Sequence, residues 1–210
     1  MKITENQIDS LRERVKERLQ SKRYGHTLGV ERMAARLARL YCPEKELMLR
    51  AAALLHDVTK RLDKEEQFEV FKRYNVEPTA EQAAVLPTIH ALTAALIIPD
   101  EYPEFADKEL IDAVRYHSTG RRNMTLSEKI IYLSDYIEDT REYEDCIALR
   151  EEFFSAEPEK MSVEERLIHL DRVMLHAIEL TVEDLTVNGR IVESGTLEAA
   201  ESLKESLNKA

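Results

Sequence analysis

The sequence predicts an all-α protein, and three observations support that prediction. Ala, Leu, Glu, Lys and Arg abound, whereas the 210 residues include only 5 Gly and 6 Pro, a balance that favours helices over sheets. Apolar residues recur three and four positions apart along nearly every segment, which is the spacing of one helix face. Thr or Ser followed three residues later by Gln or Glu, the pattern of a capping box, precedes several of these segments.

The expected helices follow one another along the whole chain. The first follows Thr4, which forms a capping box with Gln7, and the second follows Gly25 and ends before Pro43. The third, at about 46–58, is apolar on nearly all sides, which places it in the centre of a bundle. Further helices are expected at 64–74, 79–98 with a break near Pro87, 108–117, 129–138 behind a capping box of Thr125 and Glu128, 143–154, 162–185, and a short last one after Gly195. The β-like run 185–191 is expected to form a turn or a short strand.

Length and composition limit the organisation and the kind of function. We expect one domain over 1–210, with its core at about 20–155 and supporting C-terminal helices at 156–210. A formal net charge of −11 argues against binding of a nucleic-acid polymer, because that requires clustered Lys and Arg, but it leaves room for a small phosphorylated ligand. Cys42 and Cys146 are expected to be reduced thiols, with a single disulfide less favoured. Neither a signal peptide nor a membrane span is recognisable, so we expect a soluble, cytoplasmic protein.

His56 and Asp57 end the stretch AAALLHD, at the finish of the most hydrophobic predicted helix. Burying this titratable pair is costly unless partners compensate, and a metal ion does so directly because it binds neutral imidazole and ionised carboxylate. Adjacent helical residues project about 100° apart, so both can contact one ion only where the helix ends and the backbone bends. The following Val58-Thr59-Lys60 fits such an end.

Four other polar residues interrupt apolar helices in the same way: His26, His90, His117 and Asp135. Each one alone has a simpler explanation, since a lone His on an apolar face is more often a hydrogen-bonded core residue and a lone Asp is usually solvated or a cap. Together they form the ordered series H…HD…H…H…D, with each member on its own predicted helix. That series favours a metal site over a purely structural helical scaffold.

This series resembles the HD superfamily of metal phosphohydrolases, whose metal set is the pattern H…HD…D on a helical bundle. Over about residues 20–155 the chain is also similar to one bacterial branch, the YqeK-type HD proteins, which are symmetrical diadenosine tetraphosphate hydrolases. The stretches that carry this similarity are RYGHTLGV (23–30), LLHDVTK (54–60), RYHSTG (115–120) and KIIYLSDYIEDTR (129–141). The resemblance implies an HD-domain helical bundle and cleavage of diadenosine tetraphosphate into two ADP.

Carried over position by position, the resemblance implies that His26, His56, Asp57 and Asp135 hold a divalent transition metal. Iron is the family's usual ion, and a donor set of imidazole and carboxylate without thiolate also suits Mn, Co, Ni or Zn. The resemblance implies Asp57, Lys60, His90 and His117 as catalytic residues. It implies a nucleotide-contacting set around the ion that comprises Arg23, His26, Asp57, Lys60, His90, His117, Ser118, Asp135 and Arg141.

The positions of three cationic residues agree with this assignment on chemical grounds. Lys60 lies one turn beyond Asp57, Arg23 lies just ahead of His26, and Arg141 lies in the loop after the last predicted ligand. Such local positive groups allow an acidic protein to hold a polyphosphate and to stabilise the charge that develops at phosphorus.

Several alternatives stay open. His90 and His117 act as a general acid or as phosphate donors, which we favour, or they hold a second metal bridged by Asp57, as in some other HD branches. The whole chain could instead be an HD nucleotidase that acts on mono- or triphosphates, or a regulator that binds nucleotide without turnover, although the intact ligand set weighs against the regulator. The sequence leaves homodimer formation open.

Two further pairs have structural explanations. His169 and His176 are seven residues apart on one predicted helix, too far to share an ion, and are expected to pack or to face solvent. Arg121 and Arg122 are either phosphate contacts or a solvated loop pair.

Overall fold

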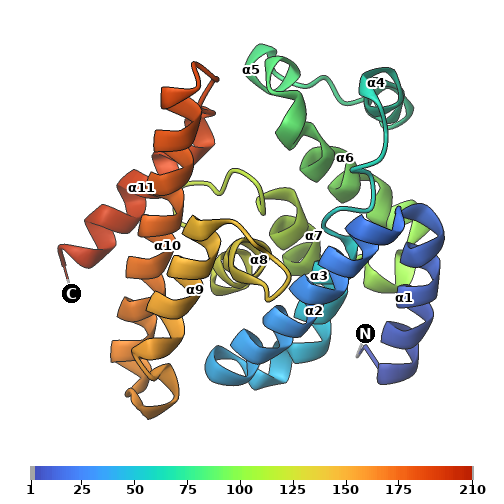
Figure 1. Ribbon diagram of the computed structural model, residues 1–210. Helices are drawn as coiled ribbons and strands as arrows, with labels where there is room; N and C mark the ends of the chain where they lie inside the picture. The colour runs from blue at the N-terminus through green and yellow to red at the C-terminus, as the bar shows by residue number, and fades with distance from the viewer. Residues whose placement is uncertain (1–2, 210) are drawn as a thin grey trace.

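The computed structural model describes residues 3–209 and confirms the all-α prediction, since that range contains helices and turns and no strand (Figure 1). Its α-helices are α1 (Glu5–Arg18), α2 (Ser21–Tyr41), α3 (Glu46–Leu55), α4 (Lys64–Arg73), α5 (Ala80–Ala84), α6 (Leu86–Glu101), α7 (Lys108–Arg115), α8 (Leu126–Ile137), α9 (Glu144–Ser155), α10 (Val163–Val187) and α11 (Ser194–Leu207). Three short 3-10 helices each begin at a proline: Pro43–Lys45, Pro103–Phe105 and Pro158–Lys160.

The helix starts follow the local chemistry of the sequence. The capping boxes predicted at Thr4 and Thr125 are both present, and further ones open α4, α5 and α10 at Asp63, Thr79 and Ser162. In each box a side-chain oxygen accepts a hydrogen bond from a backbone N–H that the helix itself leaves without a partner.

The interior is built around α3. Helix α2 packs against α3 and α8, α7 packs against α3, α6 and α8, and α1 covers α3 from outside. Leu49, Leu54 and Leu55 of α3 have no exposed surface, as expected for a helix that is apolar on most of its sides. The ends of these central helices carry the polar residues described below.

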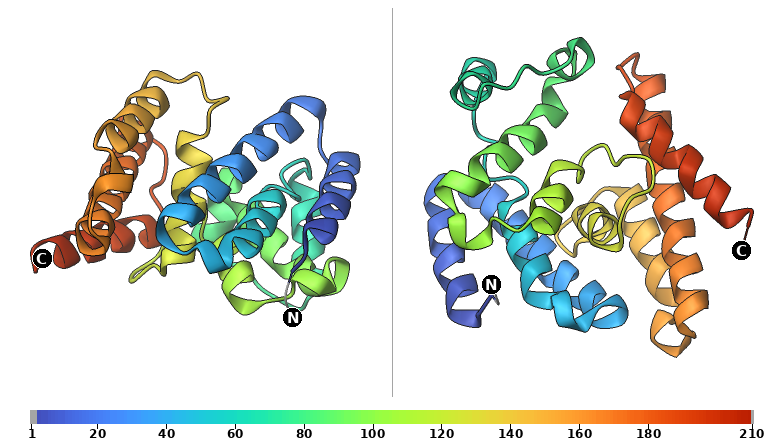
Figure 2. Two further views of the ribbon diagram at one scale, coloured as in Figure 1. Left: turned by 90° about the horizontal axis from the view of Figure 1, so that it is seen from below. Right: turned by 180° about the vertical axis from the view of Figure 1, so that it is seen from behind.

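Helices α9 and α10 pack against α8, and α11 packs against α10, so that the three form a separate layer (Figure 2). Helices α10 and α11 pack against each other, while α9 contacts both α8 and α10. This arrangement agrees with a supporting role for the C-terminal helices, and the division at about residue 155 stays a prediction.

Several predicted boundaries are wrong. The second helix begins at Ser21, four residues before Gly25, because tertiary packing outweighs the low helix propensity of an exposed glycine. The last helix spans 14 residues and is not short. The expected turn or strand at 185–191 is helical to Val187, and the chain then turns at Gly189, which adopts φ +62°.

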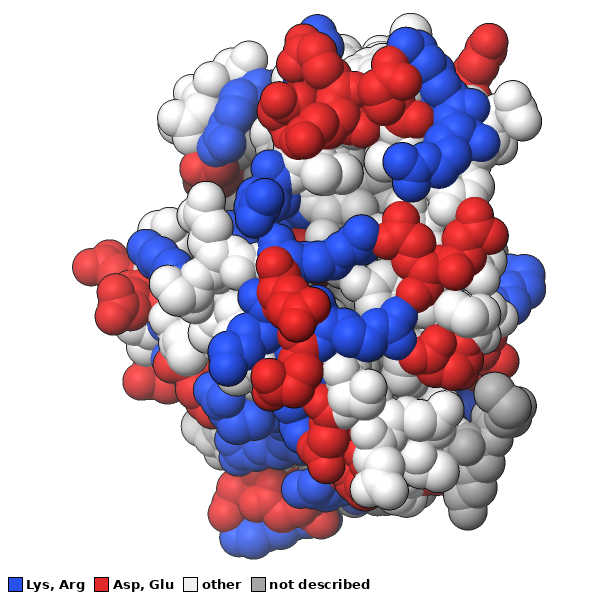
Figure 3. Space-filling model, turned by 90° about the vertical axis from the view of Figure 1, so that its right-hand side faces the viewer, with Lys and Arg blue, Asp and Glu red and all other residues white. Residues whose placement is uncertain are grey.

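Acidic and basic side chains are interspersed on the face drawn in Figure 3. Within residues 3–209, no helix combines the length and the apolar character that crossing a membrane requires.

Candidate metal centre

The four predicted ligands come from α2, from α8 and from the turn after α3, and they meet in the centre of the bundle. Helix α3 ends at Leu55, and His56 and Asp57 occupy the turn that follows it. The structure therefore confirms that this pair stands where the backbone leaves the helix. His26 reaches the same place from α2 and Asp135 from α8.

Four donor atoms of these residues face one another. The His26 Nε2 lies 3.0 Å from the Asp135 Oδ1 and 3.9 Å from the Asp57 Oδ2. The His56 Nε2 lies 3.3 Å from the Asp57 Oδ2 and 4.0 Å from the Asp135 Oδ1. Donors bound at about 2.1 Å to one ion are separated by about 3.0–4.2 Å, from neighbouring to opposite octahedral positions. These four separations fit a common ion.

The histidines of the site have their Nδ1 atoms anchored. Nδ1 lies 2.6 Å from the Ala53 carbonyl oxygen in His56, 2.9 Å from the Pro87 oxygen in His90 and 2.7 Å from the Val114 oxygen in His117. A carbonyl can only accept, so Nδ1 carries the proton and donates it. Each ring therefore presents the Nε2 lone pair to the centre of the site, as a metal ligand does.

Two imidazole nitrogens of the site have no hydrogen-bond partner although they are buried. The His26 Nε2 and the His56 Nε2 are among the unpartnered buried polar atoms of the described residues. With the protons on Nδ1, acceptor lone pairs face carboxylate oxygens, an arrangement that repels unless a cation or a proton lies between them. The residues present therefore fit a divalent metal ion.

The pKa values of Asp57, Asp135 and His117 favour ionised carboxylates and a neutral imidazole, the forms that bind metal. Although burial opposes ionisation, His56 and His90 hold the pKa of Asp57 well below its usual range. Burial likewise opposes the ionisation of Asp135, but its pKa is also well below normal because of His26 and Arg141. Burial lowers the pKa of the His117 imidazole to about 3, with help from the neighbouring histidines, so the ring is neutral at pH 7.

His90 and His117 form a second group around Asp57. The His90 Nε2 lies 3.0 Å from the Asp57 Oδ1, and the His117 Nε2 lies 4.0 Å from the same oxygen. The two Nε2 atoms are 3.1 Å apart, and the Ser118 hydroxyl is 3.1 Å from that of His117. Asp57, His90 and His117 thus have donor atoms close enough to hold an ion, which Asp57 could share with the first group.

Three cationic side chains border the same carboxylates. Arg23 donates to the Asp57 Oδ2 at 2.9 Å, and Arg141 donates to the Asp135 Oδ1 at 2.7 Å. The Lys60 ammonium lies 3.1 Å from both the Pro87 oxygen and the His90 Nδ1, and burial lowers its pKa. The structure thus brings all three to the site, while their contacts to a nucleotide stay a prediction.

One buried residue of the site was not predicted. Glu138 ends α8 and has no exposed surface, and its Oε1 lies 3.0 Å from the His26 Nδ1. Its position three residues after Asp135 is the one signal in the sequence, but an acidic chain offers many carboxylates at such spacings.

The other histidines and the arginine pair have structural roles. His169 contacts the Phe153 carbonyl oxygen at 3.0 Å, and His176 pairs with a carboxylate at the surface. Arg121 is paired with the buried Glu128, and Arg122 with two carboxylates of α11. Both arginines of this loop are thus paired within the chain, which favours the structural explanation for them. Cys42 and Cys146 are buried free thiols, as predicted.

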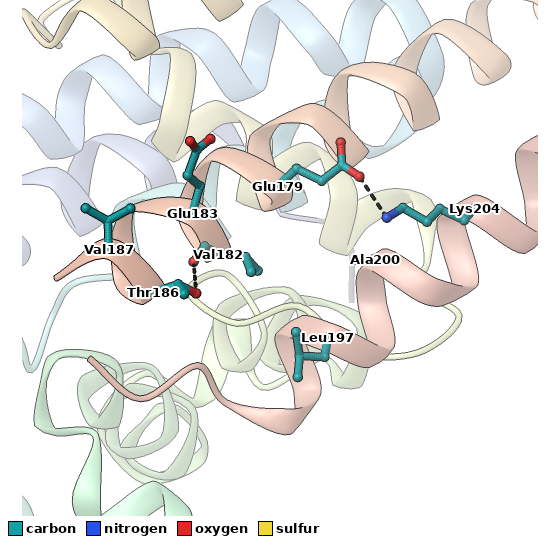
Figure 4. A pocket seen from close by; sticks show the side chains of 8 residues that line it. All are labelled: Glu179, Val182, Glu183, Thr186, Val187, Leu197, Ala200 and Lys204. Atoms are coloured by element: carbon teal, nitrogen blue, oxygen red, sulfur yellow. Dashed lines mark hydrogen bonds and ion pairs between the residues drawn. The ribbon is translucent and has the colours of Figure 1, made fainter. Parts of the chain in front are cut away.

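Two cavities adjoin the site. One of about 270 Å³ is bordered by Lys60 and His90. The other, of about 370 Å³, lies between the start of α6 and the α10–α11 connection and is lined by Val85, Ser118 and Ile191 among others. The groove between α10 and α11 in Figure 4, which is crossed by a Glu179–Lys204 ion pair, contains no residue of the predicted site.

The fold and the donor set define an HD domain. The model of that family, described as "HD domain", matches residues 23–140, and the chain belongs to the family. The match covers the four predicted ligands, whereas α9 to α11 lie outside it.

Relatives and a solved structure extend this result. The chain is similar to proteins from three bacteria that are named "Bis(5'-nucleosyl)-tetraphosphatase, symmetrical". The one from Halalkalibacterium halodurans is 36% identical over 61% of this chain and 67% of its own length. The Bacillus subtilis protein is 36% identical over 61% of this chain and 68% of its own length. The Staphylococcus aureus protein is 33% identical over 64% of this chain and 68% of its own length. A crystal structure from Clostridium acetobutylicum, described as that of a "predicted HD superfamily hydrolase involved in NAD metabolism", is similar to this chain with a TM-score of 0.79 at 30% identity. The match covers 94% of this chain and 97% of the other.

Proposed function

We propose that this chain hydrolyses diadenosine tetraphosphate symmetrically to two ADP, as a bis(5'-nucleosyl)-tetraphosphatase. The observation that carries the proposal is the convergence of four donor atoms from three parts of the bundle, with the imidazole lone pairs turned toward one point. The names of three relatives at 33–36% identity supply the substrate class.

His26, His56, Asp57 and Asp135 are the residues we propose to hold the divalent metal. We expect iron, with Mn, Co, Ni and Zn as the alternatives that suit imidazole and carboxylate donors. When bound, such an ion supplies Lewis-acid chemistry, polarising a phosphoryl oxygen and making water a better nucleophile near neutral pH. The chain fixes the position of the ion because each ligand side chain is held by a further hydrogen bond or ion pair.

The cationic residues bind and orient the polyphosphate. Arg23 and Arg141 pair with carboxylates of the proposed ligand set, and Lys60 contacts His90. Each of the three retains N–H groups that the contacts within the chain do not use. Their charge opposes that of the bound phosphates and of the transition state. Water adds across the bond between the second and third phosphates, so both products are ADP, and only one ADP half needs to be held firmly.

The geometry changes the preferred role of His90 and His117. Both rings use the Nδ1 proton on a backbone carbonyl and present only a lone pair to the site, and the pKa of each is lowered by burial. In this tautomer the Nε2 of a neutral ring accepts a proton or a cation and does not donate. Ligation of a second ion shared through Asp57 is therefore favoured over the general-acid or phosphate-donor role.

The cavity of about 370 Å³ is where we propose that the nucleoside of the retained half binds. Ser118 links this cavity to the site, because it lines the cavity and its hydroxyl contacts the His117 Nε2. The side chains of Val85, Leu185 and Ile191 supply apolar surface for a base.

Chromatography of the products tests the proposal. Metal-loaded protein should convert diadenosine tetraphosphate to ADP alone, at two equivalents for each substrate consumed, with little turnover of AMP or dATP. Formation of ATP and AMP would indicate asymmetric cleavage, and release of phosphate from AMP would favour the HD nucleotidase; either result contradicts the proposal.

A further inference from the structure

We propose that Glu138 is a positioning residue of the metal centre, which holds the His26 ring in its ligating orientation, and that Gly29 is required because it leaves room for the Glu138 carboxylate. The inference rests on the proposed metal site. It concerns how tightly the ion is held, and it does not depend on which nucleotide is cleaved.

The carboxylate of Glu138 is buried and fully engaged. Its Oε1 accepts from the His26 Nδ1 at 3.0 Å and from the Thr140 hydroxyl at 2.6 Å, while its Oε2 accepts from the Thr140 backbone N–H at 2.7 Å. Three donors around one carboxylate favour its ionised form, and the pKa of Glu138 is lowered by these hydrogen bonds in spite of burial.

His26 differs from the other three histidines in the nature of this partner. His56, His90 and His117 are each anchored by a carbonyl three residues earlier in the chain. His26 is anchored by the charged side chain of the residue that directly follows α8, the helix that carries Asp135. A carboxylate partner increases the basicity of the imidazole and fixes its orientation, and loss of such a partner typically costs about 10- to 100-fold in metal affinity.

Gly29 makes this contact sterically accessible. It lies three residues after His26, on the same side of α2. A Cβ added at Gly29 would lie 2.0 Å from the Glu138 Oε2 and 2.8 Å from the Cδ. The obstructed atoms are the end of a side chain, so we expect alanine at this position to displace the carboxylate from His26 while leaving the helices in place.

The same helix offers a matched control. Gly25 is also helical, but a Cβ there would meet nothing within 4 Å. Gly29→Ala and Gly25→Ala therefore make the same chemical change in the same helix, and only Gly29→Ala obstructs Glu138. Thr140→Val is a second control, because it removes one hydrogen bond to the carboxylate and leaves the contact to His26.

The test is the dissociation constant of the protein for Co²⁺, measured by competition with a chromophoric chelator, together with the visible spectrum of the bound ion. Gly29→Ala and Glu138→Gln should each weaken Co²⁺ binding by about 10- to 100-fold and alter the spectrum. Gln has no charge, and it places an amide NH₂ at one of the two oxygen positions, where this donor would face either the His26 Nδ1–H or the Thr140 N–H. Gly25→Ala and Thr140→Val should bind like the wild type.

The possible failures are distinct. Wild-type protein that binds no Co²⁺ refutes the proposed metal site itself. Wild-type binding with unchanged affinity in both Gly29→Ala and Glu138→Gln overturns the positioning role alone. Equal losses in Gly29→Ala and Gly25→Ala, or in Glu138→Gln and Thr140→Val, also overturn it, since the effect would then lie in the helix or in the turn. If Gly29→Ala does not fold, the Co²⁺ affinities of Glu138→Gln and Thr140→Val still test the positioning role, because only Glu138→Gln should bind the ion more weakly.

Discussion

Lys60→Met separates nucleotide binding from metal binding. The substitution removes a positive charge and keeps an unbranched apolar side chain of similar length. The Lys60 ammonium contacts the Pro87 oxygen and the His90 ring, but the His90 Nδ1 retains its own bond to Pro87 when the ammonium is gone. We therefore expect the metal centre to stay intact.

The magnitude follows from the contact that is lost. A hydrogen bond to a charged group contributes about 1.5–3 kcal/mol, and about 1.4 kcal/mol corresponds to a tenfold change in affinity. ADP should therefore bind about 10- to 140-fold more weakly to Lys60→Met. The unliganded protein should lose no stability, because burial already lowers the pKa of the Lys60 ammonium and so disfavours its charged form in the fold.

Isothermal titration calorimetry with ADP on metal-loaded protein measures this effect, with elemental analysis of the same samples. Lys72→Met is the matched control, since it removes the same charge from an exposed lysine of α4 that pairs with Glu69. Unchanged ADP affinity would remove Lys60 from the site. Loss of metal from Lys60→Met would show that Lys60 supports the metal centre. It would refute the claim that this residue acts on nucleotide binding alone.

Further predictions concern the ligands and the pH dependence. Asp57→Ala should lose bound metal and hydrolysis together, and retention of stoichiometric metal by elemental analysis would refute its assignment as a ligand. Burial lowers the pKa of His26, but Asp135 and Glu138 outweigh it and raise the pKa to about 9 in the metal-free protein, so protons compete with the ion. Affinity for Co²⁺ should consequently increase as the pH is raised toward 9, and a constant affinity over this range would contradict the assignment. The pKa of Glu193 is raised by burial, so this carboxylate destabilises the fold once it ionises, and Glu193→Gln should raise the melting temperature at pH 8 but not at pH 4. An equal change in melting temperature at pH 4 and pH 8 would show that the effect does not come from ionisation of Glu193.

The local features of the fold could be predicted from the sequence because they depend on neighbouring residues. Capping boxes at Thr4 and Thr125 and the apolar character of α3 are short-range signals, and the structure confirms them. The same reasoning placed the start of the second helix after Gly25, where the packing of α2 against α3 and α8 prevails over propensity.

The polar residues of the site could be predicted because buried His and Asp are conspicuous on apolar helices. Their orientation could not, since it depends on carbonyls such as those of Ala53 and Val114 and on the three-dimensional position of Glu138. A chain with 41 acidic residues gives no sequence signal for which carboxylate is buried against an imidazole. The sequence likewise contains no signal for the ion pair between Arg121 and Glu128.

The most direct test of the metal centre is anomalous scattering from crystals of the zinc-loaded protein. An anomalous peak should lie within about 2.0–2.2 Å of the His26 Nε2, the His56 Nε2 and a carboxylate oxygen of both Asp57 and Asp135. Peaks found only elsewhere, or none between these four side chains in fully loaded protein, would contradict the account.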